Sequence, residues 1–433
     1  MVNSEVPATV GQRLLWMMDR RRSGYGALNC PVVCRIRGPL DVALLGAALD
    51  LLTSRHEAMR TTFAGRGHNL TQVIQDPRPL ELRQFDVSGD AAPAASIRQA
   101  IKAELAARID VSRWPVRVTL WRAAAAEHVL CVNMHHLVTD AWSAGIVFQE
   151  LVLLLGQPAG VNCVLPAEGW QYRQFADYQR QLLAGDGLRR HREYWLRQLA
   201  DAQLPALRTD LTQADPNAAG SGVAHAEIDV TVTRALRRLA TQEGVTLFSV
   251  MLSVEYALLH SLTGQTDLAV GSLFANRSKP ELRRTVGFLA NMVVLRTRFP
   301  ETATFSELVH ATQRTLAGAF AYQELPYQLL PPRTIQAGSQ RVDDIVFHLV
   351  GDPGYHSRAG ELEIEMLVPE DMGGRFKCEL VVVQHGDKFS ALLFYNRDWI
   401  EPGRAAEIVS GYARLAAAAV AAPADRLAHL CGG

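Results

Sequence analysis

Two adjacent histidines and a nearby carboxylate form the segment of this sequence best suited to chemistry. His135 and His136 are followed by Asp140 within residues 134–143, which read MHHLVTDAWS. A neutral imidazole accepts protons near pH 7, and a carboxylate one turn further along can hold the backbone that carries it. Neighbouring side chains on a strand point to opposite faces, so one histidine faces a given cavity while the other packs locally. The pattern therefore predicts one working and one supporting histidine.

Two other interpretations of this segment stay open on the residues alone. A histidine pair at the end of a strand is more often structural than catalytic, and a motif match is only a hypothesis. A zinc site could use His and Asp ligands, but it needs a third protein ligand that the local spacing does not supply. Adjacent residues also converge poorly on one ion. We therefore expect no bound metal.

The histidines are expected where a strand is followed by a helix. Residues 116–120 and 129–132 have the β-rich composition of two antiparallel strands joined by a short connection. After Asp140 the apolar residues recur at helical spacing, and Ser143 is placed to satisfy amide groups at the helix start. Earlier in the chain, Asp41 is a candidate cap for a helix over residues 42–52.

The rest of the chain repeats this alternation of strands and helices. Strands are predicted at 224–230, 267–273, 344–350 and 379–383, and helices at 233–242, 247–262, 305–320 and from 402 onward. Segments 156–169 and 208–222 are rich in Gly, Pro and polar residues and resemble linkers. Two comparable halves result, at 1–180 and 181–433, and the fold class is α/β.

Composition excludes several classes of protein. The 433 residues are 48% apolar and carry 44 basic against 44 acidic side chains, so the chain can bury a large core and lacks the basic excess of nucleic-acid-binding proteins. No apolar run approaches the length of a membrane span, and no signal peptide is evident at the N-terminus. The six cysteines form no C-x-x-C pair. We expect a cytoplasmic protein with reduced thiols and no membrane partner.

A series of short blocks resembles one known family. The motif HHLVTDA resembles the H-H-x-x-x-D-G mark of the chloramphenicol acetyltransferase-like superfamily, and the other blocks resemble those of the condensation domains of nonribosomal peptide synthetases in the same order. These blocks are residues 11–16 (GQRLLW), 55–63 (RHEAMRTTF), 172–176 (YRQFA), 286–291 (VGFLAN), 322–327 (YQELPY) and 394–398 (FYNRD). Each block alone is weak, but their common order across residues 11–398 is specific.

This resemblance implies a fold and an activity. The fold would be two chloramphenicol-acetyltransferase-like lobes in a V-shaped pseudo-dimer, with a tunnel between them. The activity would be formation of an amide bond between an acyl thioester donor and an amino acid acceptor, each bound to a carrier protein. Both substrates would arrive on 4′-phosphopantetheine arms, with no cofactor bound permanently. We expect a monomer that works with donor and acceptor carrier proteins.

The resemblance also assigns roles within a catalytic motif of His135, His136 and Asp140. His136 matches the histidine that accepts a proton from the attacking amine or positions it, and His135 is its brace. Asp140 matches a carboxylate that pairs with an arginine, for which Arg277 is the candidate. The residues expected to line the tunnel are Ala141, Trp142, Ser143 and Asn291.

Two departures from the family pattern bear on these assignments. Ala141 stands where the family has glycine, and if that position needed a positive φ, the β-carbon would cost about 1 kcal/mol. Asn276 replaces a common glycine next to Arg277. Two other functions are therefore kept as alternatives: an acyltransferase that uses a free alcohol or amine, and a noncatalytic condensation-like domain that docks other enzymes.

Overall fold

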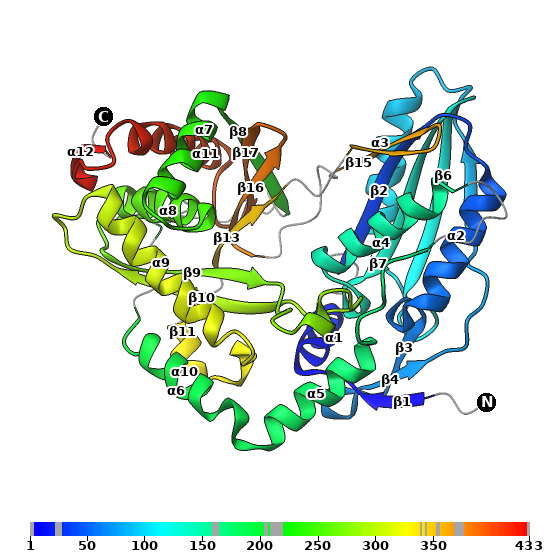
Figure 1. Ribbon diagram of the computed structural model, residues 1–433, viewed down its shortest axis with the longest axis horizontal. Helices are drawn as coiled ribbons and strands as arrows, with labels where there is room; N and C mark the ends of the chain where they lie inside the picture. Colours follow the sequence, from blue (N-terminus) through cyan, green and yellow to red (C-terminus); the bar gives the residue numbers. More distant parts are fainter. Residues whose placement is uncertain are drawn as a thin grey trace. The chain divides into compact units, whose positions relative to one another are not determined.

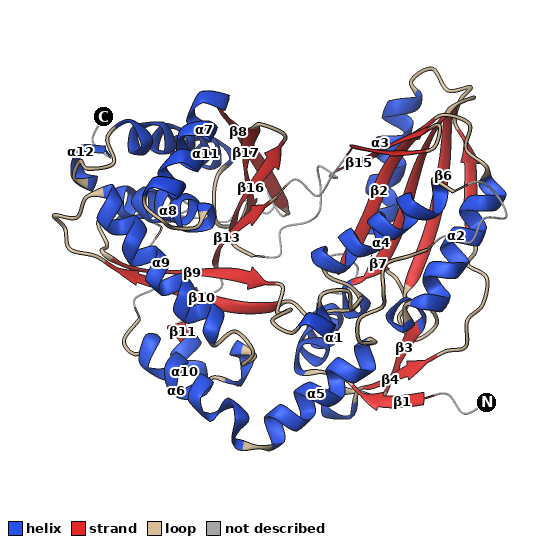
Figure 2. Cartoon of the chain, in the orientation of Figure 1, coloured by secondary structure: helices blue, strands red, loops and turns tan. Residues whose placement is uncertain are grey.

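The computed structural model describes residues 4–21, 28–157, 164–202, 207, 220–337, 340–342, 344–351, 356–367 and 376–430 (Figure 1). Much of the two linker-like segments predicted at 156–169 and 208–222 lies outside these residues. The chain forms two compact units, each containing both helices and strands (Figure 2).

The two units do not follow from one cut of the chain near residue 180. The first unit comprises Met1–Gly187, Ala275–Ala290 and Pro353–Met372, and the second comprises Leu188–Phe274, Asn291–Asp352 and Gly373–Gly433. Two segments of the predicted 181–433 half thus belong to the first unit, because strand pairing and buried ion pairs hold them there. Hydrophobic periodicity is a local signal, so it cannot reveal such returns of the chain.

The first unit is built on a six-stranded sheet with the order β14-β15-β2-β7-β6-β5. Its strands are β2 (Asn29–Arg37), β5 (Leu82–Asp86), β6 (Val116–Ala124), β7 (Glu127–His135), β14 (His356–Ala359) and β15 (Leu362–Leu367). A small sheet joins β1 (Ser4–Pro7), β4 (Thr71–Ile74) and β3 (Thr61–Ala64). The helices are α1 (Val10–Arg21), α2 (Val42–Arg55), α3 (Pro93–Ala106), α4 (Ala141–Leu155) and α5 (Tyr172–Ala184).

Helices cover both faces of this sheet. Side chains alternate between the faces along a strand, so Val32 and Cys34 of β2 join the core formed with α2 and α4, whereas Val33 packs with Ile97 of α3. Both faces of β7 are therefore buried, and this explains its nearly continuous apolar sequence. The buried strand β7 thus positions the turn and the helix that follow it, His136–Val138 and α4.

Several local predictions for this unit are confirmed. The strands predicted at 116–120 and 129–132 are the antiparallel pair β6 and β7. Asp41 caps α2, where its Oδ1 accepts hydrogen bonds from the amides of Ala43 at 2.8 Å and Leu44 at 3.1 Å. The helix expected after Asp140 is α4. The segment 55–63 forms the 3₁₀ turn Glu57–Arg60 and the short strand β3.

The second unit contains another six-stranded sheet, with the order β10-β9-β13-β16-β17-β8. Its strands are β8 (Ser221–Ile228), β9 (Asp267–Phe274), β10 (Asn291–Arg298), β13 (Ile345–Val350), β16 (Cys378–His385) and β17 (Lys388–Asn396), and a hairpin joins β11 (Gln336–Ala337) to β12 (Gln340–Arg341). The helices are α6 (Arg189–Gln198), α7 (Val230–Gln242), α8 (Leu247–Thr263), α9 (Phe305–Ala321), α10 (Pro332–Ile335), α11 (Pro402–Ala421) and α12 (Leu427–Leu430). The strands and long helices predicted for this unit are all present, and β10, β17 and the hairpin of β11 and β12 are additional.

Helix α8 is the central helix of the second unit. Thr246 caps its start, Gly264 ends it with a φ of 72°, and every residue from 249 to 259 is buried. A helix that is apolar on all sides is typical of a core position. Within the described residues, no single helix has the length and hydropathy to cross a membrane. Helices α7 and α8 meet that test only as a pair bent by 112°.

Candidate active site

His136 lies in a short turn between β7 and α4. Strand β7 ends at His135, the 3₁₀ turn η3 covers His136–Val138, and α4 starts at Ala141. The amide of His136 donates to the carbonyl of Leu28 at 2.7 Å, so the turn is fixed to the chain that leads into β2. The predicted change from strand to helix at the histidine pair is therefore correct.

The ring of His136 is buried and oriented by its own turn. His136 is 6% exposed, and its Nδ1 lies 2.9 Å from the carbonyl oxygen of Thr139. A carbonyl oxygen only accepts hydrogen bonds, so Nδ1 carries the proton and Nε2 carries the lone pair of the neutral ring. Phe288 meets the imidazole edge to face, with ring centres 5.7 Å apart. This tautomer makes Nε2 the basic nitrogen.

His135 has a different environment, which agrees with a supporting role. The amide of Leu137 donates to its Nδ1 at 3.1 Å, so the proton of the neutral ring lies on Nε2. Nε2 lies 3.8 Å from Oδ1 of Asp19. Burial raises the pKa of Asp19, but His135 and Arg108 outweigh that effect and leave the pKa below its ordinary value. His135 thus caps the turn that carries its neighbour.

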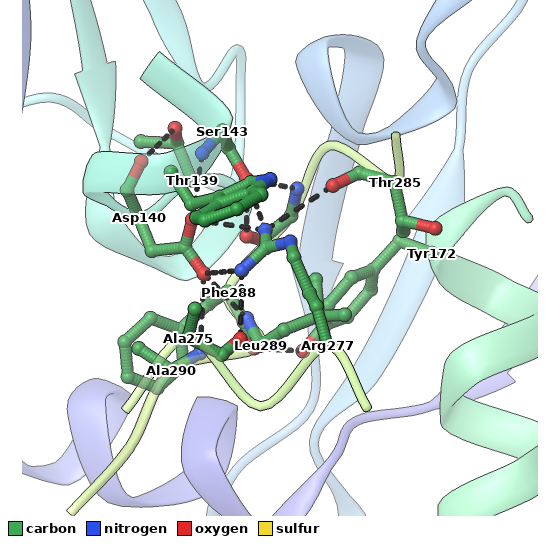
Figure 3. Close-up of polar contacts among 12 residues, drawn as sticks. Thr139, Asp140, Ser143, Tyr172, Ala275, Arg277, Thr285, Phe288, Leu289 and Ala290 are labelled. Carbon is green, nitrogen blue, oxygen red and sulfur yellow. Dashed lines mark hydrogen bonds and ion pairs between the residues drawn. The ribbon is translucent and has the colours of Figure 1, made fainter. Parts of the chain in front are cut away.

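Asp140 is fully engaged by hydrogen bonds (Figure 3). As the N-cap of α4 it accepts the amide of Ser143 on Oδ1 at 2.8 Å. Its Oδ2 accepts the amides of Leu289 at 3.0 Å and Ala290 at 3.1 Å. Arg277 donates to both carboxylate oxygens, with each distance 3.0 Å. With these five hydrogen bonds, Asp140 joins the start of α4 to Arg277 and to the backbone at 289–290.

Arg277 is buried with its partner and ties several backbone groups together. The side chains of Arg277 and Asp140 are 2% and 3% exposed. The guanidinium also donates to Ser143 Oγ at 2.8 Å and to the carbonyls of Ala275 at 2.8 Å and Thr285 at 3.2 Å. A buried arginine needs such a set of acceptors, because an unsatisfied charge is costly there.

The segment at 286–290 approaches His136 through Phe288. Gly287 exchanges backbone hydrogen bonds with Ser143 Oγ, at 2.9 Å from its carbonyl and 3.1 Å from its amide. A β-carbon on Gly287 would lie 1.9 Å from Cδ2 of Tyr172, so only glycine fits. The hydroxyl of Tyr172 donates to the carbonyl of Phe288 at 2.8 Å. These contacts fix the residue that touches the imidazole.

A second buried carboxylate, on α4, anchors the segment Ala275–Ala290, which returns to the first unit and is called the returning segment below. Glu150 accepts from Arg284 at 2.7 Å, contacts His56 Nε2 at 2.8 Å and lies 3.1 Å from Arg55 Nε. Burial raises the pKa of Glu150, but these partners outweigh it, and the pKa is below its ordinary value. The segment that carries Arg277 is therefore held to α4 at two places.

The four residues expected to line a tunnel have distinct positions. Ala141 is the exposed first residue of α4, with a helical backbone, so the feared strain at this position does not occur. Trp142 is half exposed and donates its indole N–H to the carbonyl of Arg283 at 2.9 Å. Ser143 is buried in the Arg277 network. In the second unit, Asn291 donates to the carbonyls of Gln323 at 2.6 Å and Leu325 at 2.8 Å. Ser143 and Asn291 thus make structural contacts.

Of the two positions that depart from the family pattern, Asn276 is the one with a positive φ, of 53°. Asparagine tolerates this left-handed conformation better than other residues with a β-carbon. The replacement of a common glycine by Asn276 therefore preserves the turn that presents Arg277. The family's glycine at position 141 is not required by the backbone here.

Sequence reasoning missed the roles of Gln12, Thr9 and Tyr172. Gln12 donates to the carbonyl of Leu137 at 3.0 Å, and Thr9 shares a hydrogen bond of 3.0 Å with Tyr172. Two of these residues lie in blocks that carried the resemblance, at 11–16 and 172–176, and that position was the only available signal. Their hydrogen bonds connect residues more than 100 positions apart, which no local pattern reports.

The described residues offer neither a metal site nor a reactive thiol near this turn. Among the residues that the structure describes, no three His, Cys, Asp or Glu side chains are grouped to hold a metal ion. Four of the six cysteines are described, all buried, and no disulfide joins them. Burial raises the pKa of the Cys34 thiol to about 12, so this thiol is poorly suited to act as a nucleophile. The chemistry available at this site is that of an oriented imidazole.

Comparisons with known proteins agree with this geometry. A family model for the condensation domain matches residues 2–430. The chain is 30% identical over 439 residues to chondramide synthase cmdD of Chondromyces crocatus and 30% identical over 434 residues to cyclosporin synthetase simA of Tolypocladium inflatum. Each alignment covers 98% of this chain, but they cover only 11% and 3% of those proteins.

Solved structures share the fold across the whole chain. The first condensation domain of the CDA synthetase matches with a TM-score of 0.84 at 18% identity, covering 98% of each chain. The X-domain from teicoplanin biosynthesis matches with a TM-score of 0.84 at 21% identity, covering 99% of this chain and 98% of that one. The α/β fold predicted from the sequence is therefore confirmed, and the chain belongs to the condensation domain family, as the order of its sequence blocks indicated.

Proposed function

We propose that this chain catalyses acyl transfer from a carrier-bound thioester to a carrier-bound amino acid and so forms an amide bond. The amine nitrogen of the acceptor attacks the thioester carbonyl, the new C–N bond forms and the C–S bond breaks. The proton lost by the amine ends on the departing thiol of the donor's phosphopantetheine arm. One observation carries the proposal: the 2.9 Å contact between His136 Nδ1 and the Thr139 carbonyl leaves Nε2 as a base.

Two roles of His136 are compatible with this tautomer. Nε2 can accept the proton as the amine attacks, or it can accept a hydrogen bond that orients the amine while the proton leaves by another route. Both roles need a neutral ring with its lone pair on Nε2, and His135 and Asp140 maintain the turn that provides it. Condensation by this route needs no covalent enzyme intermediate.

The proposed partners are two carrier proteins, each bearing a 4′-phosphopantetheine arm. The relatives named above are synthetases of the nonribosomal peptide type. Multidomain enzymes of that kind hold both substrates on carrier proteins. We propose that this chain acts as a monomer between a donor and an acceptor carrier.

A noncatalytic role is the second candidate, because one structural neighbour is the X-domain, which was solved in complex with OxyB from teicoplanin biosynthesis. The chain matches that X-domain with a TM-score of 0.83 at 22% identity. The oriented imidazole of His136 favours catalysis. Transfer to a free amine or alcohol is a third reaction that the same base could support.

Single-turnover condensation distinguishes these functions. Carrier domains are loaded with a panel of synthetic acyl-pantetheines and aminoacyl-pantetheines, mixed with the protein, and analysed by mass spectrometry for the amide on the acceptor. We expect amide from at least one pair and at least a hundredfold loss of rate in His136→Ala, with Arg404→Met, in an exposed ion pair of α11, as a control close to wild type. Absence of amide from every pair, or an unchanged rate in His136→Ala, contradicts the proposal. Product with a free amine at an equal rate supports the third reaction instead.

A further inference from the structure

Two segments of the first unit set the surroundings of the His136 ring, and a backbone carbonyl of each, Leu137 and Phe288, is held by a hydrogen bond. The carbonyl of Leu137 lies in the same 3₁₀ turn as the imidazole, and Phe288, whose ring meets the imidazole, belongs to the returning segment at 275–290. The turn sets where the ring is attached, and Phe288 limits how the ring can tilt. Both carbonyls accept a hydrogen bond from a buried side chain.

These two hydrogen bonds are connected through Gln12, whose side chain donates to one carbonyl and whose backbone N–H starts the hydrogen bonds that lead to the other. The side-chain Nε2 of Gln12 donates to the carbonyl of Leu137 at 3.0 Å. The backbone N–H of Gln12 donates to Thr9 Oγ1 at 3.2 Å. Thr9 Oγ1 lies 3.0 Å from the hydroxyl of Tyr172, which donates its own proton to the carbonyl of Phe288 at 2.8 Å. Since Tyr172 has only one proton, Thr9 is the donor between the two hydroxyls.

The donors in this chain point in a consistent order, from the amide of Gln12 through Thr9 and Tyr172 to Phe288. Chains of hydrogen bonds with one direction polarise one another in a medium of low dielectric constant. Gln12, Thr9 and Tyr172 are 1%, 4% and 2% exposed, so water does not compete for these groups. Burial also raises the pKa of Tyr172, which keeps its hydroxyl protonated and able to donate.

Part of this arrangement has an ordinary structural explanation. Thr9 and Gln12 form the reciprocal bonds of a capping box at the start of α1, with the Thr9 amide donating to Gln12 Oε1 at 3.0 Å. A cap alone does not require Gln12 to reach Leu137 or Tyr172 to reach Phe288. Those two contacts are the ones that bear on the imidazole.

We propose that Gln12, Thr9 and Tyr172 form a positioning relay, which holds the turn of His136 and the ring of Phe288 in a fixed relation to each other. The relay rests on the proposed function of His136 and acts through geometry, without touching a substrate. Small displacements of a catalytic group reduce rate strongly, so the relay affects turnover more than binding.

The test removes one hydroxyl group. Tyr172→Phe breaks the relay between Thr9 and Phe288. The matched control is Tyr256→Phe in the second unit, because Tyr256 is also fully buried and its hydroxyl also donates to a backbone carbonyl, that of Leu295 at 2.7 Å. Each hydroxyl also has a threonine as a second partner, Thr9 for Tyr172 and Thr297 for Tyr256. Both variants therefore lose hydrogen bonds of the same two types, and a merely structural role predicts similar effects on stability and on rate.

Two readouts separate positioning from stability. In single-turnover condensation with the loaded carriers, we expect the maximal rate constant to fall about tenfold in Tyr172→Phe, with the half-saturating concentration of each carrier within twofold. In Tyr256→Phe the maximal rate constant should stay within twofold of wild type. In protein labelled with ¹⁵N-histidine, the ring signals of His136 should move from the single tautomer with a protonated Nδ1 toward a mixture in Tyr172→Phe alone. Thr9→Ser, which keeps a hydroxyl, should behave like wild type in both experiments.

The outcomes distinguish this inference from the proposed function. If His136→Ala is inactive but Tyr172→Phe matches Tyr256→Phe in the single-turnover rate constant and in the ¹⁵N spectrum, the relay is wrong and the catalytic assignment stands. If His136→Ala is active, the catalytic assignment is wrong, and the ¹⁵N spectrum alone decides whether the relay positions the ring.

Discussion

Replacing Arg277 by Met is expected to destabilise the first unit by about 3 kcal/mol. Breaking a buried ion pair costs roughly 3–5 kcal/mol, because one charge is left without its partner. Asp140 would keep three of its five hydrogen bonds, those from the amides of Ser143, Leu289 and Ala290. This remaining solvation by amides places the cost at the lower end of the range.

The reverse change, Asp140→Ala, is expected to cost more, about 4–5 kcal/mol. It leaves the guanidinium of Arg277 with only hydroxyl and carbonyl acceptors. It also removes the acceptor for the amides of Ser143, Leu289 and Ala290. The double variant should be at least about 2 kcal/mol more stable than the sum of the single effects predicts, because no charge is then left alone.

Urea unfolding of the four proteins measures this cycle, with Arg404→Met as the control. Arg404 pairs with Glu407 on an exposed face of α11 at 3.0 Å, and such a surface pair is worth at most about 1 kcal/mol. Hydrogen exchange gives a local check, since the amides of Leu289 and Ala290 should lose protection in Asp140→Ala. A cost below about 1 kcal/mol for Arg277→Met, or additive effects in the double variant, would refute the argument from burial.

Three further predictions concern single positions. Burial raises the pKa of Glu255 from its ordinary value of 4.5 to about 8, so the folded protein keeps a proton there that the unfolded chain has lost. Wild type should therefore lose unfolding free energy relative to Glu255→Gln, on the order of 1 kcal/mol per pH unit from about pH 4.5 to 8, and the difference should stay constant above pH 8. Urea titrations of both proteins across this pH range measure the difference. Gly287→Ala should cost at least about 2 kcal/mol in thermal unfolding, because the new methyl group meets the ring of Tyr172, whereas Gly145→Ala in α4, where a β-carbon meets nothing within 4 Å, should stabilise by roughly 0.5–1 kcal/mol. Ala141→Gly should leave the condensation rate within about threefold of wild type, since the backbone is already helical there; a gain above tenfold would show that the methyl group obstructs the reaction.

The strands and helices around the histidines could be predicted because their signals are local. Alternation in β6 and β7, helical spacing in α4 and the cap at Asp41 each depend on a few neighbouring residues. The returning segments could not be found in this way. Arg277 lies 137 positions after Asp140, and the resemblance to a family, rather than any pattern in this sequence, named it as the partner.

The backbone of the catalytic turn shows where such a resemblance can mislead. The glycine that the family has at the position of Ala141 suggested a need for positive φ. The chain instead changes direction at Asp140, whose φ of −135° and ψ of 178° are extended, as expected for an N-cap. Ala141 then simply starts the helix. The position that does need left-handed backbone is Asn276, and asparagine meets that need.

The two carboxylates of α4 together explain how the returning segment can be a reliable part of the site. Asp140 and Glu150 are ten residues apart, which corresponds to about 15 Å along a helix. They bind Arg277 and Arg284 of the same segment. One anchor would leave the segment able to pivot, whereas two anchors at this separation also fix its direction along α4. Phe288 follows Arg284, the second anchor, by only four residues. The two anchors therefore also limit the position of the Phe288 ring against the imidazole of His136.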